Sequence, residues 1–118
     1  MKKFLLIIMC IIFLTGCSGS EKYSVNYVQA KEKIINEGAI LVDVRTEEEY
    51  SEGHIAGAIL LPLDSIDKDS VRESVGDKKT IIIVYCQSGK RSSQALEKLN
   101  GLGYKNVYDL GAMSNWKE

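Results

Sequence analysis

The feature that most constrains this fold is a stretch in which an apolar run, a short polar loop and a helix-forming run follow one another. The apolar run is rich in β-branched residues and ends at a cysteine, Thr80-Ile-Ile-Ile-Val-Tyr-Cys86. The helix-forming run is Ser93-Gln-Ala-Leu-Glu-Lys-Leu99. A strand, a loop and a helix in this order bring backbone N–H groups and a helix N-terminus around one point. Such an environment favours a reactive thiolate, so we expect the rest of the chain to hold this loop in place.

Short apolar runs alternate with helix-forming runs along the chain from residue 24 onward. This alternation predicts an α/β fold in which helices cover both faces of a parallel sheet. In such sheets the chemistry lies at the carboxyl ends of the strands, where we expect both Cys86 and the stretch Asp43-Val-Arg45. The predicted strands are 39–44, 58–61, 80–85 and 106–110, and the predicted helices are 26–36, 46–50, 64–75 and 92–100.

Two of the predicted helices carry clear start signals. Asn26 and Gln29 form the residue pair of a capping box. Thr46 is followed by three glutamates, which are favourable in the first turn of a helix. The residues expected on the buried face of the first helix are Val28, Ile34 and Ile35.

Length, charge and composition exclude several classes of function. A chain of 118 residues has room for one domain. The formal net charge is -1 and no basic patch dominates, so we expect no nucleic-acid partner. His54 is the only histidine, and together with one free cysteine it does not supply the ligands of a metal site. We therefore expect no metal or other cofactor, and the composition leaves the oligomeric state open.

The first residues have the pattern of a targeting segment. Lys2 and Lys3 precede the uncharged apolar run from Phe4 to Leu14, which is short for a membrane span. The run ends in Leu14-Thr-Gly-Cys17, which resembles the bacterial lipobox. A lipoprotein signal peptide is the interpretation that joins these three features. The alternatives are an uncleaved N-terminal anchor and cleavage at another residue.

This interpretation divides the chain into a removed signal peptide at 1–16, a lipidated Cys17 with its tether at 17–23, and one domain at 24–118. We then expect a protein outside the cytoplasm that is held by lipid on a bacterial membrane. Removal of Cys10 and lipidation of Cys17 would leave Cys86 as the only free thiol. A lone thiol in an exported domain suggests a reactive group, and the alternative is a small buried apolar side chain.

Three stretches in this order resemble the sequence signatures of the rhodanese family. The first runs from Asp43 to Pro62, and the second, Cys86-Gln-Ser-Gly-Lys-Arg-Ser92, resembles the family's C-x-x-G-x-R-S active-site loop. The third runs from Gly103 to Trp116 and departs from the family by having Ala112 in place of a usual glycine. The resemblance implies a rhodanese-like three-layer fold, with a parallel sheet of about five strands and a cysteine that carries a persulfide.

The resemblance also implies a reaction, the transfer of sulfane sulfur. Cys86 would take sulfur from thiosulfate or a persulfide and pass it to a thiol or to cyanide. A thiolate attacks such a sulfur atom directly, so no general base is needed. The residues implied to form the substrate-binding loop around Cys86 are Gln87, Ser88, Gly89, Lys90, Arg91 and Ser92.

Other candidate residues are expected around this loop instead of at the reacting atoms. Asp43 and Arg45 are expected to form an ion pair or network below the loop, with a direct catalytic role as the alternative. Glu49 is expected either to be part of a solvated helix start or to bind an arginine. The resemblance implies that His54 holds the scaffold, while a role as general base for the cysteine is the alternative. Lys90 is expected either to attract the substrate or to be a solvated surface charge.

Two other functions compete with sulfur transfer. One is a sensing or interaction module that uses the rhodanese fold without turnover, although the intact cysteine loop disfavours it. The other is a thiol phosphatase or arsenate reductase, whose loop places five residues between cysteine and arginine. Here only Gln87, Ser88, Gly89 and Lys90 lie between Cys86 and Arg91. The shorter loop favours the binding of a single sulfur atom over a phosphoryl group.

Overall fold

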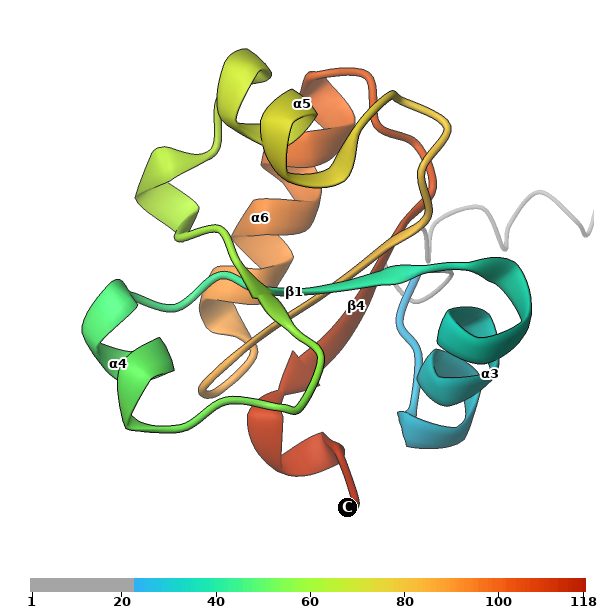
Figure 1. Cartoon of the computed structure of the whole chain (residues 1–118), viewed down its shortest axis with the longest axis vertical. Coiled ribbons are helices and arrows are strands. Elements are labelled where there is room, and N and C mark those ends of the chain that lie inside the picture. Colours follow the sequence, from blue (N-terminus) through green and yellow to red (C-terminus); the bar gives the residue numbers. More distant parts are fainter. Residues whose placement is uncertain (1–22) are drawn as a thin grey trace, which may run out of the picture.

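The structure is a computed structural model that describes residues 23–118. Within this range strands and helices alternate, as the sequence predicts (Figure 1). The expected signal peptide and lipidated Cys17 lie outside the described residues and stay predictions. No helix in 23–118 is long and apolar enough to cross a membrane.

In chain order the elements are α3 (Tyr27–Glu37), β1 (Ile40–Asp43), α4 (Glu47–Glu52), β2 (Ile59–Leu60), the 3-10 turn η2 (Leu63–Ser65), α5 (Lys68–Val75), β3 (Ile82–Cys86), α6 (Lys90–Gly101), β4 (Val107–Ala112) and the 3-10 turn η3 (Met113–Asn115).

The strands form a parallel sheet in the order β2-β1-β3-β4. The parallel sheet is confirmed, but the part of the chain that the structure describes has four strands instead of about five. Beside β4, Ser24 forms only an isolated parallel bridge with Asp109. In the pairing of β1 with β3, Asp43 lies opposite Tyr85. The carboxyl ends of these two strands therefore bring Asp43 and Cys86 to the same edge of the sheet.

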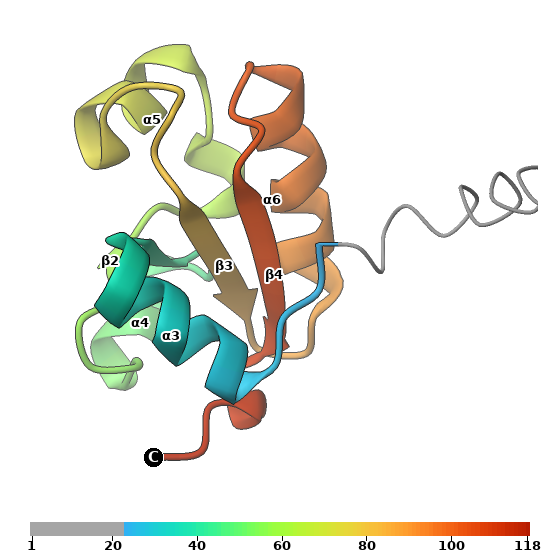
Figure 2. The same ribbon diagram turned by 90° about the vertical axis from the view of Figure 1, so that its right-hand side faces the viewer.

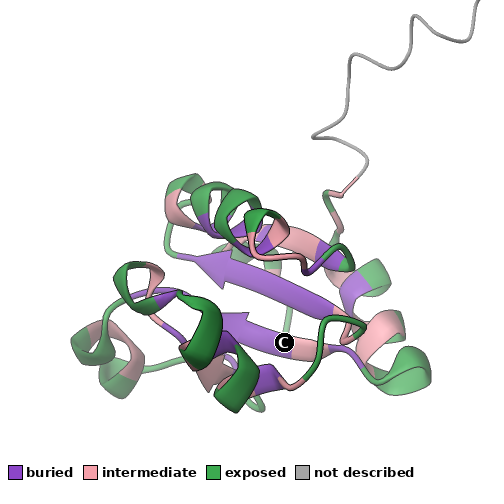
Figure 3. Cartoon of the chain, turned by 90° about the horizontal axis from the view of Figure 1, so that it is seen from above, coloured by how far each residue is buried: buried purple, intermediate pink, exposed green. Residues whose placement is uncertain are grey.

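Helices cover both faces of the sheet because the side chains of each strand alternate between the faces. Val84 and Cys86 of β3 belong to one buried cluster together with Leu99 of α6. Ile83 and Tyr85 belong to a second cluster, to which α3 contributes its buried residue Ala30. Figure 2 shows α3 and α6 on opposite sides of β3 and β4. Figure 3 shows the strands as the buried centre between largely exposed helices.

The helix α3 begins as predicted but turns a different face toward the sheet. Its capping box is present, since Gln29 N donates to Asn26 Oδ1 over 2.8 Å and Asn26 N donates to Gln29 Oε1 over 2.9 Å. The expected burial of Val28 and Ile35 is wrong, because these side chains are 68% and 69% exposed. Ile34 packs against the buried cluster as expected, together with Ala30, and their spacing of four residues places them on one side of the helix.

The helix α5 is shorter than predicted. The segment expected at 64–75 begins with the 3-10 turn η2, and the α-helix starts only at Lys68. Its start is another capping box, in which Ser70 N donates to Asp67 Oδ1 over 2.8 Å and Asp67 N donates to Ser70 Oγ over 3.0 Å. Asp at the N-cap and Ser three residues later were the signal in the sequence for this boundary.

Candidate active site

The loop after β3 turns directly into the helix α6. Gly89 is the N-cap of α6 and has φ +100°, a conformation that residues with a Cβ rarely adopt. The helix begins at Lys90, so the predicted start at Ser92 was two residues late. The predicted end was also early, because Gly101 is the last residue of the helix and not its cap. Lys90 and Arg91 therefore lie in the first turn of the helix.

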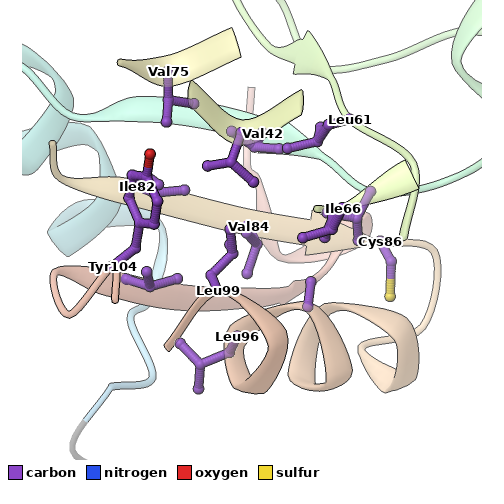
Figure 4. Close-up of a cluster of buried hydrophobic side chains, with 14 residues drawn as sticks. Val42, Leu61, Ile66, Val75, Ile82, Val84, Cys86, Leu96, Leu99 and Tyr104 are labelled. Atoms are coloured by element: carbon purple, nitrogen blue, oxygen red, sulfur yellow. The ribbon is translucent and has the colours of Figure 1, made fainter. Parts of the chain in front are cut away.

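The sulfur of Cys86 lies inside this loop and receives two backbone hydrogen bonds. Gly89 N donates to Sγ over 3.0 Å and Ser92 N donates over 3.3 Å. The Ser92 hydroxyl donates to Gly89 O over 3.1 Å, which closes the turn. Cys86 is fully buried, and Figure 4 shows it at one end of the apolar cluster beside Ile66. Two N–H donors on one sulfur stabilise a negative charge on a thiolate or on a sulfur bound to it.

Sequence reasoning placed the whole loop around the cysteine, and the structure separates its members by exposure. Gln87, Ser88 and Lys90 are exposed, whereas Ser92 is fully buried. The exposed residues are open to a substrate, and the buried Ser92 serves the turn itself. The described residues include no group of three His, Cys, Asp or Glu side chains that could hold a metal ion.

A buried ion pair supports the loop from below. Arg45 Nη2 lies 2.8 Å from Asp43 Oδ2, and the two side chains are 5% and 0% exposed. Arg45 Nε donates to both carboxylate oxygens over 3.1 Å, and Arg45 N donates to Asp43 Oδ1 over 2.8 Å. Arg45 Nη1 also donates to Gln87 Oε1 over 3.3 Å, and Nη2 donates to Gly53 O over 2.6 Å. The predicted ion pair is therefore present, and it contacts the loop through Gln87.

Tyr85 belongs to the same network, and sequence reasoning missed it. Its hydroxyl donates to Asp43 Oδ2 over 2.7 Å and accepts from Ile55 N over 3.1 Å. Burial raises the pKa of the Tyr85 hydroxyl, and the adjacent Asp43 carboxylate adds to this effect. The signal in the sequence was a polar hydroxyl at a strand position that alternates away from Cys86. Such a hydroxyl needs a partner when it is buried on the opposite face.

A second ion pair joins the loop to the helix α4. Arg91 Nη1 donates to Glu49 Oε1 over 2.8 Å, and Arg91 Nη2 donates to Glu49 Oε2 over 3.0 Å. The Arg91 hydrogen bonds, followed by that from Thr46 N, lower the pKa of Glu49 to about 2. The pKa of Arg91 is raised, mainly by Glu49 and to a smaller extent by the nearby Cys86. The arginine partner expected for Glu49 is thus Arg91 of the loop.

His54 lies on the surface and holds the turn after α4. Its Nδ1 lies 2.8 Å from Tyr50 O, and its ring stacks on the Tyr50 ring with the centroids 3.6 Å apart. Its hydrogen bond and its ring contact both go to Tyr50, which agrees with the scaffold role. Neither of them brings His54 to Cys86.

A small hollow of about 70 Å³ borders the Glu49–Arg91 pair. Its wall includes Arg45, Thr46, Asp64 and Arg91. Two larger hollows, of about 590 and 480 Å³, lie beside α3, and no residue of the loop 86–92 lines them. Within the loop 86–92, Arg91 is the residue that lines the small hollow.

Comparison with known proteins adds to this geometry. Residues 27–118 match the family model described as a rhodanese-like domain. Over 74 residues the chain is 38% identical to the thiosulfate sulfurtransferase PspE of Escherichia coli, covering 63% of this chain and 70% of that protein. It is 31% identical over 94 residues to the thiosulfate sulfurtransferase GlpE of Coxiella burnetii, covering 79% of this chain and 85% of that protein. The human single-domain sulfurtransferase TSTD1 superposes with a TM-score of 0.69 at 25% identity, covering 81% of this chain and 97% of that chain.

Proposed function

This chain belongs to the rhodanese-like domain family, and on that premise we propose that it is a sulfurtransferase in which Cys86 carries the transferred sulfur. The single observation that carries the proposal is the pair of backbone N–H groups on Cys86 Sγ, at 3.0 and 3.3 Å. The relatives named as thiosulfate sulfurtransferases support thiosulfate as the sulfur donor, and a persulfide is the alternative donor. A thiol would be the natural acceptor, and cyanide serves as the acceptor in an assay.

The proposed reaction has two steps. In the first step the Cys86 thiolate attacks the outer sulfur of thiosulfate, an S–S bond forms, and the S–S bond of thiosulfate breaks so that sulfite leaves with the electron pair. In the second step cyanide or an acceptor thiolate attacks the outer sulfur of the Cys86 persulfide. The bond between the two sulfur atoms then breaks, and the Cys86 thiolate is regenerated. In each step the attacking group supplies the electron pair of the new bond to sulfur and the leaving group takes the pair of the broken S–S bond, so the cycle with thiosulfate and cyanide needs no further oxidant or reductant.

The loop geometry supports sulfur transfer over phosphate hydrolysis. Gly89 N and Ser92 N both donate to Sγ itself, so these two donors are directed at a sulfur atom. A phosphoryl group would need donors for three oxygens beyond the sulfur. The four-residue separation of Cys86 and Arg91 agrees with this preference.

Because Cys86 is fully buried, a donor reaches Sγ only through a local movement of the residues around it. The exposed residues Gln87, Ser88 and Lys90 are the part of the loop that can shift without loss of apolar contacts. Gln87 is joined to the buried Asp43–Arg45 pair by its hydrogen bond with Arg45, at 3.3 Å.

The test is Cys86→Ser, which keeps the size of the side chain but removes the soft nucleophile. We expect thiosulfate:cyanide sulfur transfer to fall to background, and intact mass after thiosulfate to show one added sulfur only in the wild type. Circular dichroism controls for the fold, and an aryl phosphate assay tests the phosphatase alternative. Retained transfer by a folded Cys86→Ser protein would reject Cys86 as the carrier. A stable persulfide that no acceptor removes would favour the sensing module.

We also propose that the protein is anchored outside the cytoplasm by lipid on Cys17. The support comes from the sequence, in which Lys2, Lys3 and an apolar run precede Leu14-Thr-Gly-Cys17. Stable anchoring needs more than one acyl chain, which lipoprotein processing supplies. Intact mass of the protein from the membrane fraction would show the lipid on Cys17. A soluble protein without added mass would reject the anchor.

A further inference from the structure

Arg91 lies in the first turn of α6 and lines the small hollow, but its charged end is already occupied. Both of its terminal nitrogens donate to Glu49, over 2.8 and 3.0 Å, and they use both carboxylate oxygens. These two nitrogens are the donors with which a guanidinium clamps a planar or tetrahedral oxyanion. An anion that binds Arg91 in the same way must therefore displace Glu49.

Glu49 is held in its competing position by the start of α4. Its Oε1 accepts from Thr46 N over 2.9 Å and from Thr46 Oγ1 over 3.1 Å. Glu49 N in turn donates to Thr46 Oγ1 over 3.2 Å, which completes a capping box. The helix start therefore holds the carboxylate in its position independently of Arg91.

Both arginines in the wall of the small hollow are already paired with a carboxylate. The wall contains Arg45 and Arg91, and Arg45 is bound to Asp43 in the buried network. Asp64, in the same wall, adds a further carboxylate. The Glu49–Arg91 pair is the more exposed of the two, with side chains 32% and 33% exposed, so it is the pair that an anion can open.

We propose that Glu49 is a specificity-determining residue of the sulfur-transfer reaction, because its carboxylate competes with the donor's anionic group for Arg91. This inference rests on the proposed function and adds the class of donor that the site prefers. Thiosulfate carries two negative charges, so the Glu49 carboxylate repels it more strongly than it repels a donor with one charge. The binding of a singly charged donor is therefore weakened less. The site thus favours sulfane donors of low charge, such as organic persulfides and thiosulfonates.

The test is Glu49→Gln, which removes the charge but keeps the capping box, because glutamine at this helix position accepts the same hydrogen bond. The matched control is Glu48→Gln, an equal change of net charge at an exposed neighbour in the same turn. With cyanide as acceptor, KM and kcat are measured for thiosulfate and for singly charged benzenethiosulfonate. We expect Glu49→Gln to lower KM for thiosulfate by about fivefold, the upper range for a partly exposed ion pair, and to lower KM for benzenethiosulfonate by less.

Two further comparisons separate this effect from a structural one. In Arg91→Ala, the additional change Glu49→Gln should no longer alter KM for thiosulfate. Binding of sulfite, measured by calorimetry on Cys86→Ser and on Cys86→Ser with Glu49→Gln, reports the competition without turnover. Tighter sulfite binding in the second protein supports the proposal even if sulfur transfer itself were absent. Equal KM changes in Glu49→Gln and Glu48→Gln, or equal effects on both donors, would overturn it while leaving Cys86 as the sulfur carrier.

Discussion

Two arginine–carboxylate pairs support the cysteine loop, and they differ most in their burial. The Asp43–Arg45 pair is 0% and 5% exposed, and its arginine also binds Gly53 O and Gln87. The Glu49–Arg91 pair is 32% and 33% exposed to solvent. Burial makes a charge expensive to leave unpaired, whereas a solvated pair can open at little cost. We infer that the buried pair builds the loop and the exposed pair regulates which donors reach it.

The largest expected effect comes from breaking the buried pair. Asp43→Asn keeps the shape of the side chain but leaves the Arg45 guanidinium buried without a counter-charge. We expect the free energy of unfolding to fall by about 3–5 kcal/mol, as measured by urea denaturation at pH 7. Glu49→Gln is the comparison, and it should cost no more than about 1 kcal/mol.

A double substitution tests the reason for this loss. Asp43→Leu with Arg45→Met removes both charges, and part of the lost stability should return because no unpaired charge stays buried. If Asp43→Asn and Glu49→Gln destabilised the protein equally, the contrast between the two pairs would be wrong.

A smaller effect is expected from the hydroxyl that extends the buried network. Tyr85→Phe removes the donor to Asp43 Oδ2 and leaves the buried Ile55 N–H without its acceptor. An unpaired buried polar group costs about 1–3 kcal/mol, which thermal unfolding would detect. The matched control is Tyr104→Phe, which breaks one hydrogen bond to the partly buried Gly76 O and should cost less. A larger loss of stability in Tyr104→Phe than in Tyr85→Phe would contradict the supporting role of the Tyr85 hydroxyl.

The smallest expected effect is the pH dependence of the exposed pair. The pKa of Glu49 is lowered in the folded protein from 4.5 to about 2, mainly by Arg91. A lowered pKa means that the pair stabilises the fold fully above pH 4.5 and that this stabilisation is lost as the pH falls toward 2. The difference in unfolding free energy between wild type and Glu49→Gln should therefore shrink over this range. Because the pair is partly exposed, the whole difference should be no more than about 1 kcal/mol. A difference that stayed constant from pH 6 to pH 3 would contradict the assignment.

Local sequence signals predicted the order of elements and the position of the loop well. The capping box predicted at Asn26 and the helix start predicted at Thr46 are present, and the strand that ends at Cys86 lies in the middle of the parallel sheet. These features depend on neighbouring residues and on alternation within one segment, so they can be inferred before any long-range contact is known.

Other features could not be predicted because they depend on which segments meet in space. Val28 and Ile35 carry apolar side chains but face solvent, since the sheet contacts Ala30 and Ile34. The partner of Glu49 lies 42 residues away at Arg91, and that distance in the sequence carries no local signal. The same holds for the Tyr85 hydroxyl and the Asp43 carboxylate, which are also 42 residues apart.

By itself, the sequence determined the α/β class, the strand–loop–helix around Cys86 and the short spacing from Cys86 to Arg91. Local propensity and turn chemistry are sufficient for these features. Only the tertiary structure decided that Arg91 binds Glu49 and that Arg45 holds Asp43 and Gln87. It also decided that the Cys86 sulfur is buried beneath two N–H donors. Pairing and burial are set by the packing of strands and helices against one another, and packing joins residues that are distant in the chain.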